Sequence, residues 1–226
     1  MTKAPQPGRV KTRLTPPLTS EEAAALNICF LRDTSAAITH ASDRARGVGV
    51  YTPVGQETAY AGILPEHFYL IAQRGESFGE RLSNAAADLL DVGFRACCLI
   101  DSDSPTVTAN AFRAAVDELL RDEEQIVIGP SDDGGYYLIG MQRLHRRLFE
   151  DIDWSTERVL SQTIGRAREI GFEPVMLPAF YDIDDRATLR RLCSDLFDGH
   201  DAQAPATKQF LAELIAREGR ERISPQ

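Results

Sequence analysis

Helical and strand-like segments alternate along almost the whole chain. Apolar residues at helical spacing predict helices over 23–38, 78–90, 108–120, 158–169, 187–196 and 207–217. Short apolar runs bounded by turn residues predict strands over 47–52, 68–72, 96–100, 125–128, 136–139 and 173–177. Because such alternation favours a mainly parallel sheet with helices on both faces, we expect an α/β fold.

Composition limits the class of protein further. A chain of 226 residues is long enough for one sizeable α/β domain. Its net charge of −9 argues against nucleic acid as the main partner, since phosphate backbones bind basic surfaces. No apolar run approaches the roughly 18 residues of a membrane span, and no signal-peptide core is present. The four cysteines form no CxxC pattern, so we expect a reduced, cytoplasmic protein without a membrane partner.

The carboxyl-terminal part has the composition of a linker followed by an amphipathic helix. We therefore divide the chain into a domain over 1–198 and a linker with a C-terminal helix over 199–226. The apolar residues of that helix share one face: Phe210, Leu211, Leu214 and Ile215. Such a face docks on the domain or on a second subunit, and a homodimer is the oligomer we expect.

Two aspartates follow the apolar strand 96–100 directly. Asp101 and Asp103 stand where ligands bind in open α/β sheets, beyond the carboxyl end of a strand. Carboxylate oxygens in that place suit a hard divalent cation such as Mg²⁺. The alternative is that an aspartate or serine of this turn caps the helix that follows.

The amino-terminal loop is basic in an otherwise acidic protein. Lys3, Arg9, Lys11 and Arg13 lie in a proline-rich and glycine-containing segment that suits phosphate binding through charge and exposed backbone N–H groups. A disordered basic tail is the other reading. Arg81 opens the helix 78–90, where it faces either an anion or a neighbouring carboxylate.

Two further acidic segments also follow strands. The segment 129–140 carries Asp132 and Asp133 before Gly134 and Gly135, a pattern that fits a β-hairpin turn and also allows a ligand to approach the main chain.

The second acidic segment contains Asp182, Asp184 and Asp185, of which the last two could instead cap the next helix. Between the two acidic segments, Trp154 could stack on a base or sugar, but packing against a helix is the interpretation we favour.

Six segments in order carry a family resemblance: KAPQPGRVKTRL, QRGESFGERL, LIDSDSP, GPSDDGGYYLIG, DIDWST and YDIDD. Over roughly residues 1–195 they resemble a bacterial branch of the nucleotide-diphospho-sugar transferase superfamily. This branch is of the arsenosugar-biosynthesis-type glycosyltransferases and is related to molybdenum-cofactor guanylyltransferases. The resemblance implies a three-layer, Rossmann-like fold of the glycosyltransferase-A type.

One departure from the family concerns the first strand. In the family an apolar strand directly precedes the basic loop and is central to the sheet, whereas here Met1 stands at the end of that strand. We therefore expect the fold to lack its usual first strand, unless the chain starts upstream or another segment takes its place.

The resemblance also implies roles for individual residues. Asp103 and Asp101 would hold Mg²⁺ or Mn²⁺, and Asp184 would complete the metal site or act as a base. Asp132 and Asp133 would face the donor sugar or the acceptor, with Asp133 a second candidate base. Contacts to the nucleotide and its phosphates would come from Lys3, Arg9, Lys11, Arg13, Arg81, Gly134 and Gly135.

The function hypothesis is a metal-dependent glycosyltransferase that takes a sugar from a nucleotide and passes it to a small-molecule acceptor. An alternative within enzymes is a nucleotidyltransferase that joins a nucleoside triphosphate to a phosphorylated small molecule. An alternative of another class is a non-catalytic nucleotide-binding or scaffold protein.

Overall fold

Two small sheets form the centre of the protein, which a computed structural model describes over residues 1–199 and 202–223. The first sheet is parallel, in the order β1 (Thr2–Lys3), β2 (Val48–Thr52), β3 (Tyr69–Ala72). The second is mixed, in the order β4 (Cys97–Ile100), β6 (Tyr136–Met141), β5 (Ile126–Pro130), β7 (Val175–Met176). In it β6 runs antiparallel to β4 and β5, while β5 and β7 are parallel.

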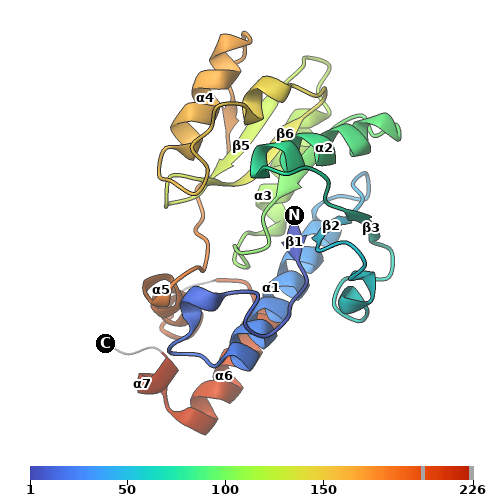
Figure 1. Cartoon of the computed structure of the whole chain (residues 1–226). Coiled ribbons are helices and arrows are strands. Elements are labelled where there is room, and N and C mark those ends of the chain that lie inside the picture. The colour runs from blue at the N-terminus through green and yellow to red at the C-terminus, as the bar shows by residue number, and fades with distance from the viewer. Residues whose placement is uncertain (200–201, 224–226) are drawn as a thin grey trace.

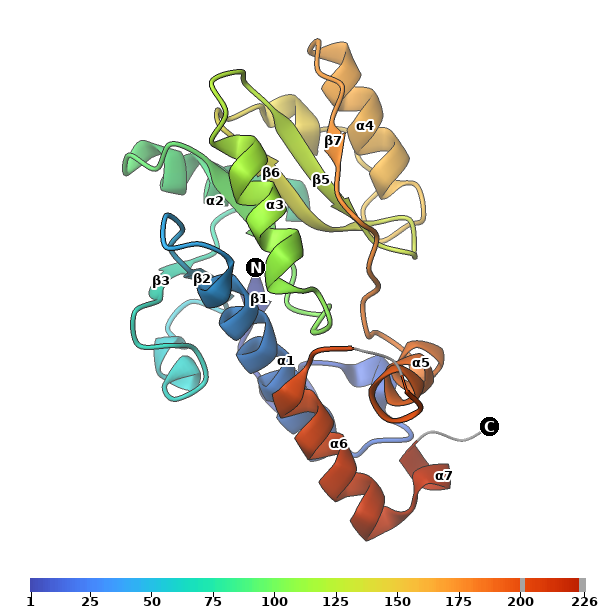
Figure 2. The same cartoon turned by 180° about the vertical axis from the view of Figure 1, so that it is seen from behind.

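Helices cover both faces of the second sheet. The long helices are α1 (Ser20–Ala41), α2 (Phe78–Asp91), α3 (Ala109–Leu119), α4 (Val159–Glu169), α5 (Arg186–Phe197) and α6 (Pro205–Glu218). The short ones are η1 (Thr12–Leu14), η2 (Glu57–Tyr60), η3 (Arg146–Phe149) and α7 (Arg220–Ile223). Figure 1 shows α2 and α4 in front of β5 and β6, and Figure 2 shows α3 on the opposite face. The predicted α/β, three-layer architecture is confirmed.

Every predicted helix and strand is present. Thr19 is the N-cap of α1, where Thr19 and Glu22 form a capping box, each side chain accepting a hydrogen bond from the other's backbone N–H. The segment 126–128 is an apolar run without alternation because helices cover both of its faces, and all three residues are fully buried. The hairpin predicted for β5 and β6 is confirmed.

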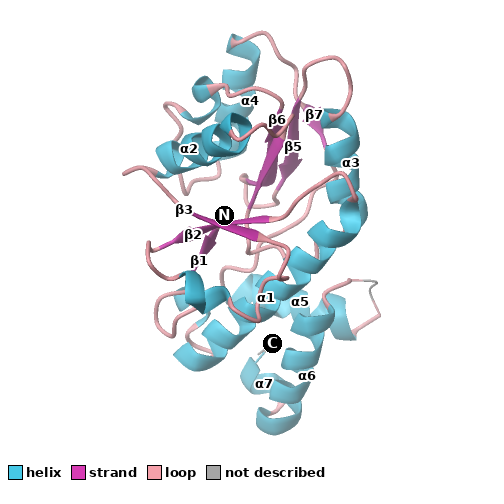
Figure 3. Ribbon diagram, turned by 90° about the vertical axis from the view of Figure 1, so that its right-hand side faces the viewer, coloured by secondary structure: helices cyan, strands magenta, loops and turns pink. Residues whose placement is uncertain are grey.

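The first strand is reduced to its last two residues. β1 pairs with β2 at Tyr51 and Thr52 only, so Val48 and Gly49 have β3 on one side and no strand on the other. β4 is likewise an edge strand, and Figure 3 shows the two sets of strands meeting close to the amino terminus. The Met1 amino group donates to Ile100 O at 2.6 Å at this junction.

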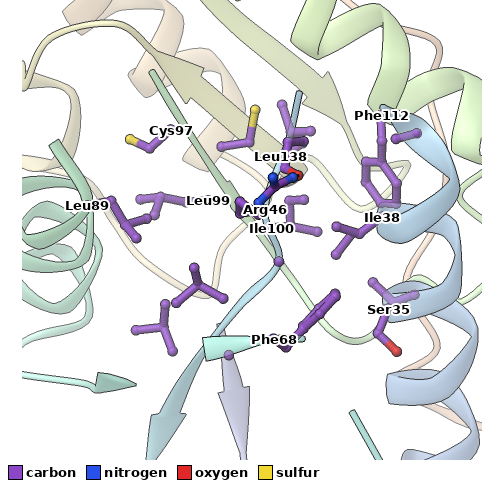
Figure 4. A pocket seen from close by; sticks show the side chains of 18 of the residues that line it. Ser35, Ile38, Arg46, Phe68, Leu89, Cys97, Leu99, Ile100, Phe112 and Leu138 are labelled. Carbon is purple, nitrogen blue, oxygen red and sulfur yellow. The ribbon is translucent and has the colours of Figure 1, made fainter. Parts of the chain in front are cut away.

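An apolar groove of about 230 Å³ lies between the free edges of β2 and β4. Its walls come from α1, α3 and both sheets, and Figure 4 shows Ile38, Phe68, Leu89, Leu99 and Phe112 around it. The groove therefore lies in the sheet beside the two residues of β1.

The C-terminal helix packs on the domain, beside α1 (Figure 2). Leu211 and Leu214 of α6 are fully buried, as their shared apolar face predicted. The carboxylate of Asp33 on α1 accepts hydrogen bonds from the N–H groups of Ala206 and Thr207, at 2.9 and 2.8 Å. The domain boundary at 198 and the homodimer stay predictions, and linker residues 200–201 lie outside the described residues.

None of the helices that the structure describes combines the length and the hydropathy needed to cross a membrane.

Because Asp33 satisfies two N–H groups at the start of α6, Asp33→Ala leaves both without a partner in a buried place. We expect a loss of about 2 to 3 kcal/mol in the free energy of unfolding, measured by urea denaturation. Asp117→Ala is the control, because Asp117 is 57% exposed in a surface pair with Arg44 and should change the free energy by no more than about 0.5 kcal/mol. Equal effects of the two substitutions would contradict this role of Asp33.

Candidate functional site

One cavity of about 710 Å³ lies beyond the ends of β1, β4 and β5. Asp132 and Gly134 do not line it, but it brings together the other residues for which the sequence predicts a role: Lys3, Arg9, Lys11, Arg13, Arg81, Asp101, Asp103, Asp133, Gly135 and Asp184. They converge because the loops after neighbouring strands open on the same edge of an α/β sheet.

Lys11 lies at the centre of the charged residues. Its side chain is 4% exposed, and Nζ contacts Asp103 Oδ1 at 2.8 Å and Asp184 Oδ1 at 2.9 Å. The third donor goes to Ile183 O at 2.8 Å. Burial alone would lower the pKa of Lys11, but the two carboxylates outweigh it and raise the pKa. Lys11 therefore acts as a fixed internal cation, with all three of its N–H donors used inside the protein.

The aspartates after β4 are held in a tight turn. Asp101 accepts hydrogen bonds from the Ser104 hydroxyl at 2.9 Å and from Asp103 N at 3.2 Å. Burial, followed by repulsion from Asp103, raises the pKa of Asp101 to about 7. The capping alternative for this turn is wrong, because Thr108 caps α3 through the N–H of Ala111.

The three aspartates of the acidic segment before α5 have different roles. Asp185 caps α5 through Thr188 N at 2.9 Å, so the capping alternative holds for this residue. Burial would raise the pKa of Asp184, but Lys11 outweighs it and holds the pKa below its usual range. Asp182 lines the cavity, and burial together with Asp133 and Asp184 raises its pKa to about 6.

Three cations on the cavity wall have no carboxylate partner among the residues described. Lys3 and Arg9 make no side-chain hydrogen bond or ion pair, and Arg81 donates only to the carbonyls of Gly75 and Glu76. Arg13 differs, with Asp184 and Asp185 at 4.0 and 3.6 Å. An anion entering the cavity would meet Lys3, Arg9 and Arg81 without breaking an ion pair.

The Asp-Asp-Gly-Gly turn supports one wall. Gly134 does not line the cavity: with φ at +87°, a Cβ there would lie 2.2 Å from Glu157 O, so this glycine allows two backbones to pack. Asp132 also points elsewhere, bound by Arg191 Nη1 at 2.6 Å. Asp133 is exposed on the cavity and accepts a hydrogen bond from Gly135 N at 2.8 Å.

Trp154 packs against the core, as the sequence analysis favoured, and also lines the cavity. Its ring meets Phe78 edge-on, with centroids 5.0 Å apart and planes at 81°. For two of the lining residues, Asp182 and Asn27, no role was predicted from the sequence. The acidic segment was a signal for Asp182, whereas Asn27 shows in the sequence only as one polar residue within an apolar helical run.

The oxygen ligands of the site suit a hard cation, but no metal cage is assembled among the described residues. No group of three or more His, Cys, Asp or Glu residues is arranged there to hold an ion. Lys11 already bridges Asp103 and Asp184. Since Mg²⁺ often takes only one or two carboxylates and completes its shell with water and phosphate, Asp101 and Asp103 fit such an ion.

The raised pKa of Asp101 makes a pH-dependent contribution to stability. The folded state binds this proton more tightly than the unfolded state, so the contribution of Asp101 to stability is lost as pH rises from about 4 to about 7. Asp101→Asn has no titrating carboxyl at this position. In metal-free buffer, its free energy of unfolding relative to that of wild type should therefore rise by up to about 1.4 kcal/mol per pH unit across that window. Urea denaturation between pH 4.5 and pH 8 measures this difference between the free energies of unfolding of Asp101→Asn and wild type.

Asp117→Asn is the control for this titration, because Asp117 lies on the surface in a pair with Arg44. If the stability difference between Asp101→Asn and wild type changes with pH no more than that of Asp117→Asn, the Asp101 pKa is not raised.

Comparison with solved structures confirms the expected fold. The chain is similar to the crystal structure of a "putative nucleotide-diphospho-sugar transferase" from Desulfovibrio desulfuricans G20, at 29% sequence identity and a TM-score of 0.84, over 96% of this chain and 95% of that chain. A CMP:2-keto-3-deoxy-manno-octonic acid synthetase complexed with CTP matches at 13% identity and a TM-score of 0.40, over 69% of this chain and 85% of that chain. A likeness of that size carries no argument about this chain.

The comparison with curated proteins found no match. The arsenosugar branch of the superfamily stays a prediction. The sequence profile of a bacterial family, DUF2064, with the description "Uncharacterized protein conserved in bacteria", matches residues 36–156. Because this match covers more than half of the chain, the protein belongs to the DUF2064 family.

Proposed function

We propose that the protein is a transferase that takes a sugar from a nucleotide-activated donor and passes it to a small-molecule acceptor. One observation carries the proposal: a cavity of about 710 Å³ has both unpaired cations and closely spaced carboxylates on its walls. Unpaired cations suit a diphosphate, and carboxylates suit the proton that an acceptor hydroxyl must lose. The similarity to the Desulfovibrio protein, with its nucleotide-diphospho-sugar name, supports the same reading.

Lys3, Arg9 and Arg81 are the proposed diphosphate contacts. Charge-assisted hydrogen bonds to phosphate oxygens are among the stronger polar interactions in proteins. When the sugar is transferred, negative charge grows on the leaving diphosphate, and cations already held in place stabilise it without reorganisation. Lys11 adds to this positive field, although its own three donors are occupied.

A carboxylate of the cavity would accept the proton of the acceptor hydroxyl. A general base works best when its pKa lies near the working pH. Lys11 depresses the pKa of Asp184 and so makes this carboxylate a weaker base, while Asp133 stays a candidate. We add Asp182, because its pKa of about 6 and its place in the cavity fit this role.

Mg²⁺ or Mn²⁺ stays part of the proposal, with Asp101 and Asp103 as the residues that would hold it. When bound, the ion would neutralise charge on the diphosphate. Under this proposal Asp103→Ala abolishes the dependence of nucleotide binding on Mg²⁺ or Mn²⁺, measured by isothermal titration with and without EDTA. Unchanged metal dependence in Asp103→Ala would contradict the assignment.

Binding of nucleotides tests the proposal directly. Thermal shift with the common nucleoside diphosphates and their sugars should reveal at least one ligand of the wild-type protein. Arg9→Gln should weaken that ligand by roughly tenfold or more, because it removes a charged hydrogen bond. Arg168→Gln is the matched control: Arg168 is exposed, pairs with Glu173 and does not line the cavity, so affinity should not change.

The products distinguish the proposed reaction from its alternatives. Sugar transfer releases a nucleoside diphosphate, whereas nucleotidyl transfer from a nucleoside triphosphate releases pyrophosphate. Pyrophosphate as the product would therefore contradict sugar transfer and identify the reaction as nucleotidyl transfer. A protein that binds none of the nucleotides, with or without Mg²⁺ and Mn²⁺, would contradict both.

A further inference from the structure

Asn27 is a buried polar residue on the wall of the cavity. It lies on α1 with 3% of its surface exposed, among helix residues that are mostly apolar. Its Oδ1 atom is sealed from solvent and has no hydrogen-bond partner among the residues described. Because nearly all buried side-chain oxygens in proteins are hydrogen-bonded, an exception beside a ligand cavity needs a physical reason.

None of the described residues donates a hydrogen bond to Asn27 Oδ1. Asn27 and Phe30 are three residues apart, so they share one face of α1. Lys11 Nζ lies over the Phe30 ring, 5.5 Å from its centroid, so a charged donor stands on this face. All three of its N–H donors are taken by Asp103, Asp184 and a backbone carbonyl. Because Asn27 lines the cavity, a bound ligand is in place to supply the partner that Oδ1 lacks.

The chemistry of an amide oxygen restricts what that partner is. Oδ1 accepts hydrogen bonds and needs a donor. The phosphate oxygens of a nucleotide are acceptors at neutral pH, so they cannot satisfy it. Hydroxyl groups of a ribose or of the transferred sugar can. The amide turns about a soft side-chain torsion, which brings the oxygen to the cavity when a ligand is bound.

We propose that Asn27 binds a hydroxyl group of the nucleotide sugar and positions the donor beside Lys11. This inference rests on the proposed function and adds to it a residue that recognises the neutral part of the ligand. Buried, unpaired polar groups destabilise a fold, and Asn27 is one that a ligand in the cavity can complete.

Asn27→Leu separates a ligand contact from a structural role, because it removes the polar group and keeps a similar volume. Without ligand, we expect the melting temperature to rise by about 2 to 4 °C, since the unpaired oxygen is gone. With ligand, the affinity for the nucleoside diphosphate or its sugar should fall by roughly tenfold, measured by isothermal titration, while pyrophosphate binding should not change.

Thr34→Val is the matched control. Thr34 lies on the same helix, its hydroxyl is also buried without a partner, and it lines the apolar groove instead of the cavity. We expect a comparable rise in melting temperature with unchanged affinity for every ligand.

The ligands also identify which hydroxyl is bound. If Asn27→Leu weakens both the nucleoside diphosphate and its sugar derivative, the ribose supplies the hydroxyl, and if it weakens only the derivative, the transferred sugar does. A lower melting temperature with unchanged affinity would overturn the inference and make Asn27 a structural residue. A wild-type protein that binds no nucleotide would overturn the proposed function as well, so the two failures are distinct.

Discussion

The ammonium group of Lys11 is the contact on which the rest of the site depends. It joins the amino-terminal loop to the turn after β4 and to the acidic segment before α5, with Asp103, Asp184 and Ile183 O as its acceptors. Two carboxylates that share one buried cation would repel each other without it. Lys11 offsets part of their charge, while Lys3 and Arg9 on the cavity wall have no ion-pair partner among the described residues and are available to an anion.

The same contact separates the carboxylates of the cavity by their proton affinity. Lys11 lowers the pKa of Asp184, whereas burial raises the pKa of Asp101 to about 7 and that of Asp182 to about 6. Titratable groups whose environments push their pKa values apart are typical of acid and base roles in one site. A cavity that has fixed cations, a carboxylate with a lowered pKa and two carboxylates with pKa values near neutral pH suits group transfer from a charged donor.

Much of the site could be predicted from sequence because strand ends in an α/β fold meet at one edge. Asp101, Asp103 and Asp133 follow strands directly, and the alternation of elements placed them together. What depended on long-range packing could not be predicted. No local pattern shows that Arg191 binds Asp132, or that Asn27 meets the cavity from the middle of α1. The antiparallel β6 and the two-residue β1 likewise follow from tertiary pairing.

A crystal structure with a bound nucleoside diphosphate tests the central claim most directly, because it shows where the charged part of the ligand lies. The account predicts the diphosphate in the cavity of about 710 Å³, in contact with Arg9 and Arg81, while Lys11 keeps its contacts with Asp103 and Asp184. A diphosphate bound outside this cavity, or bound there without either arginine, would contradict it.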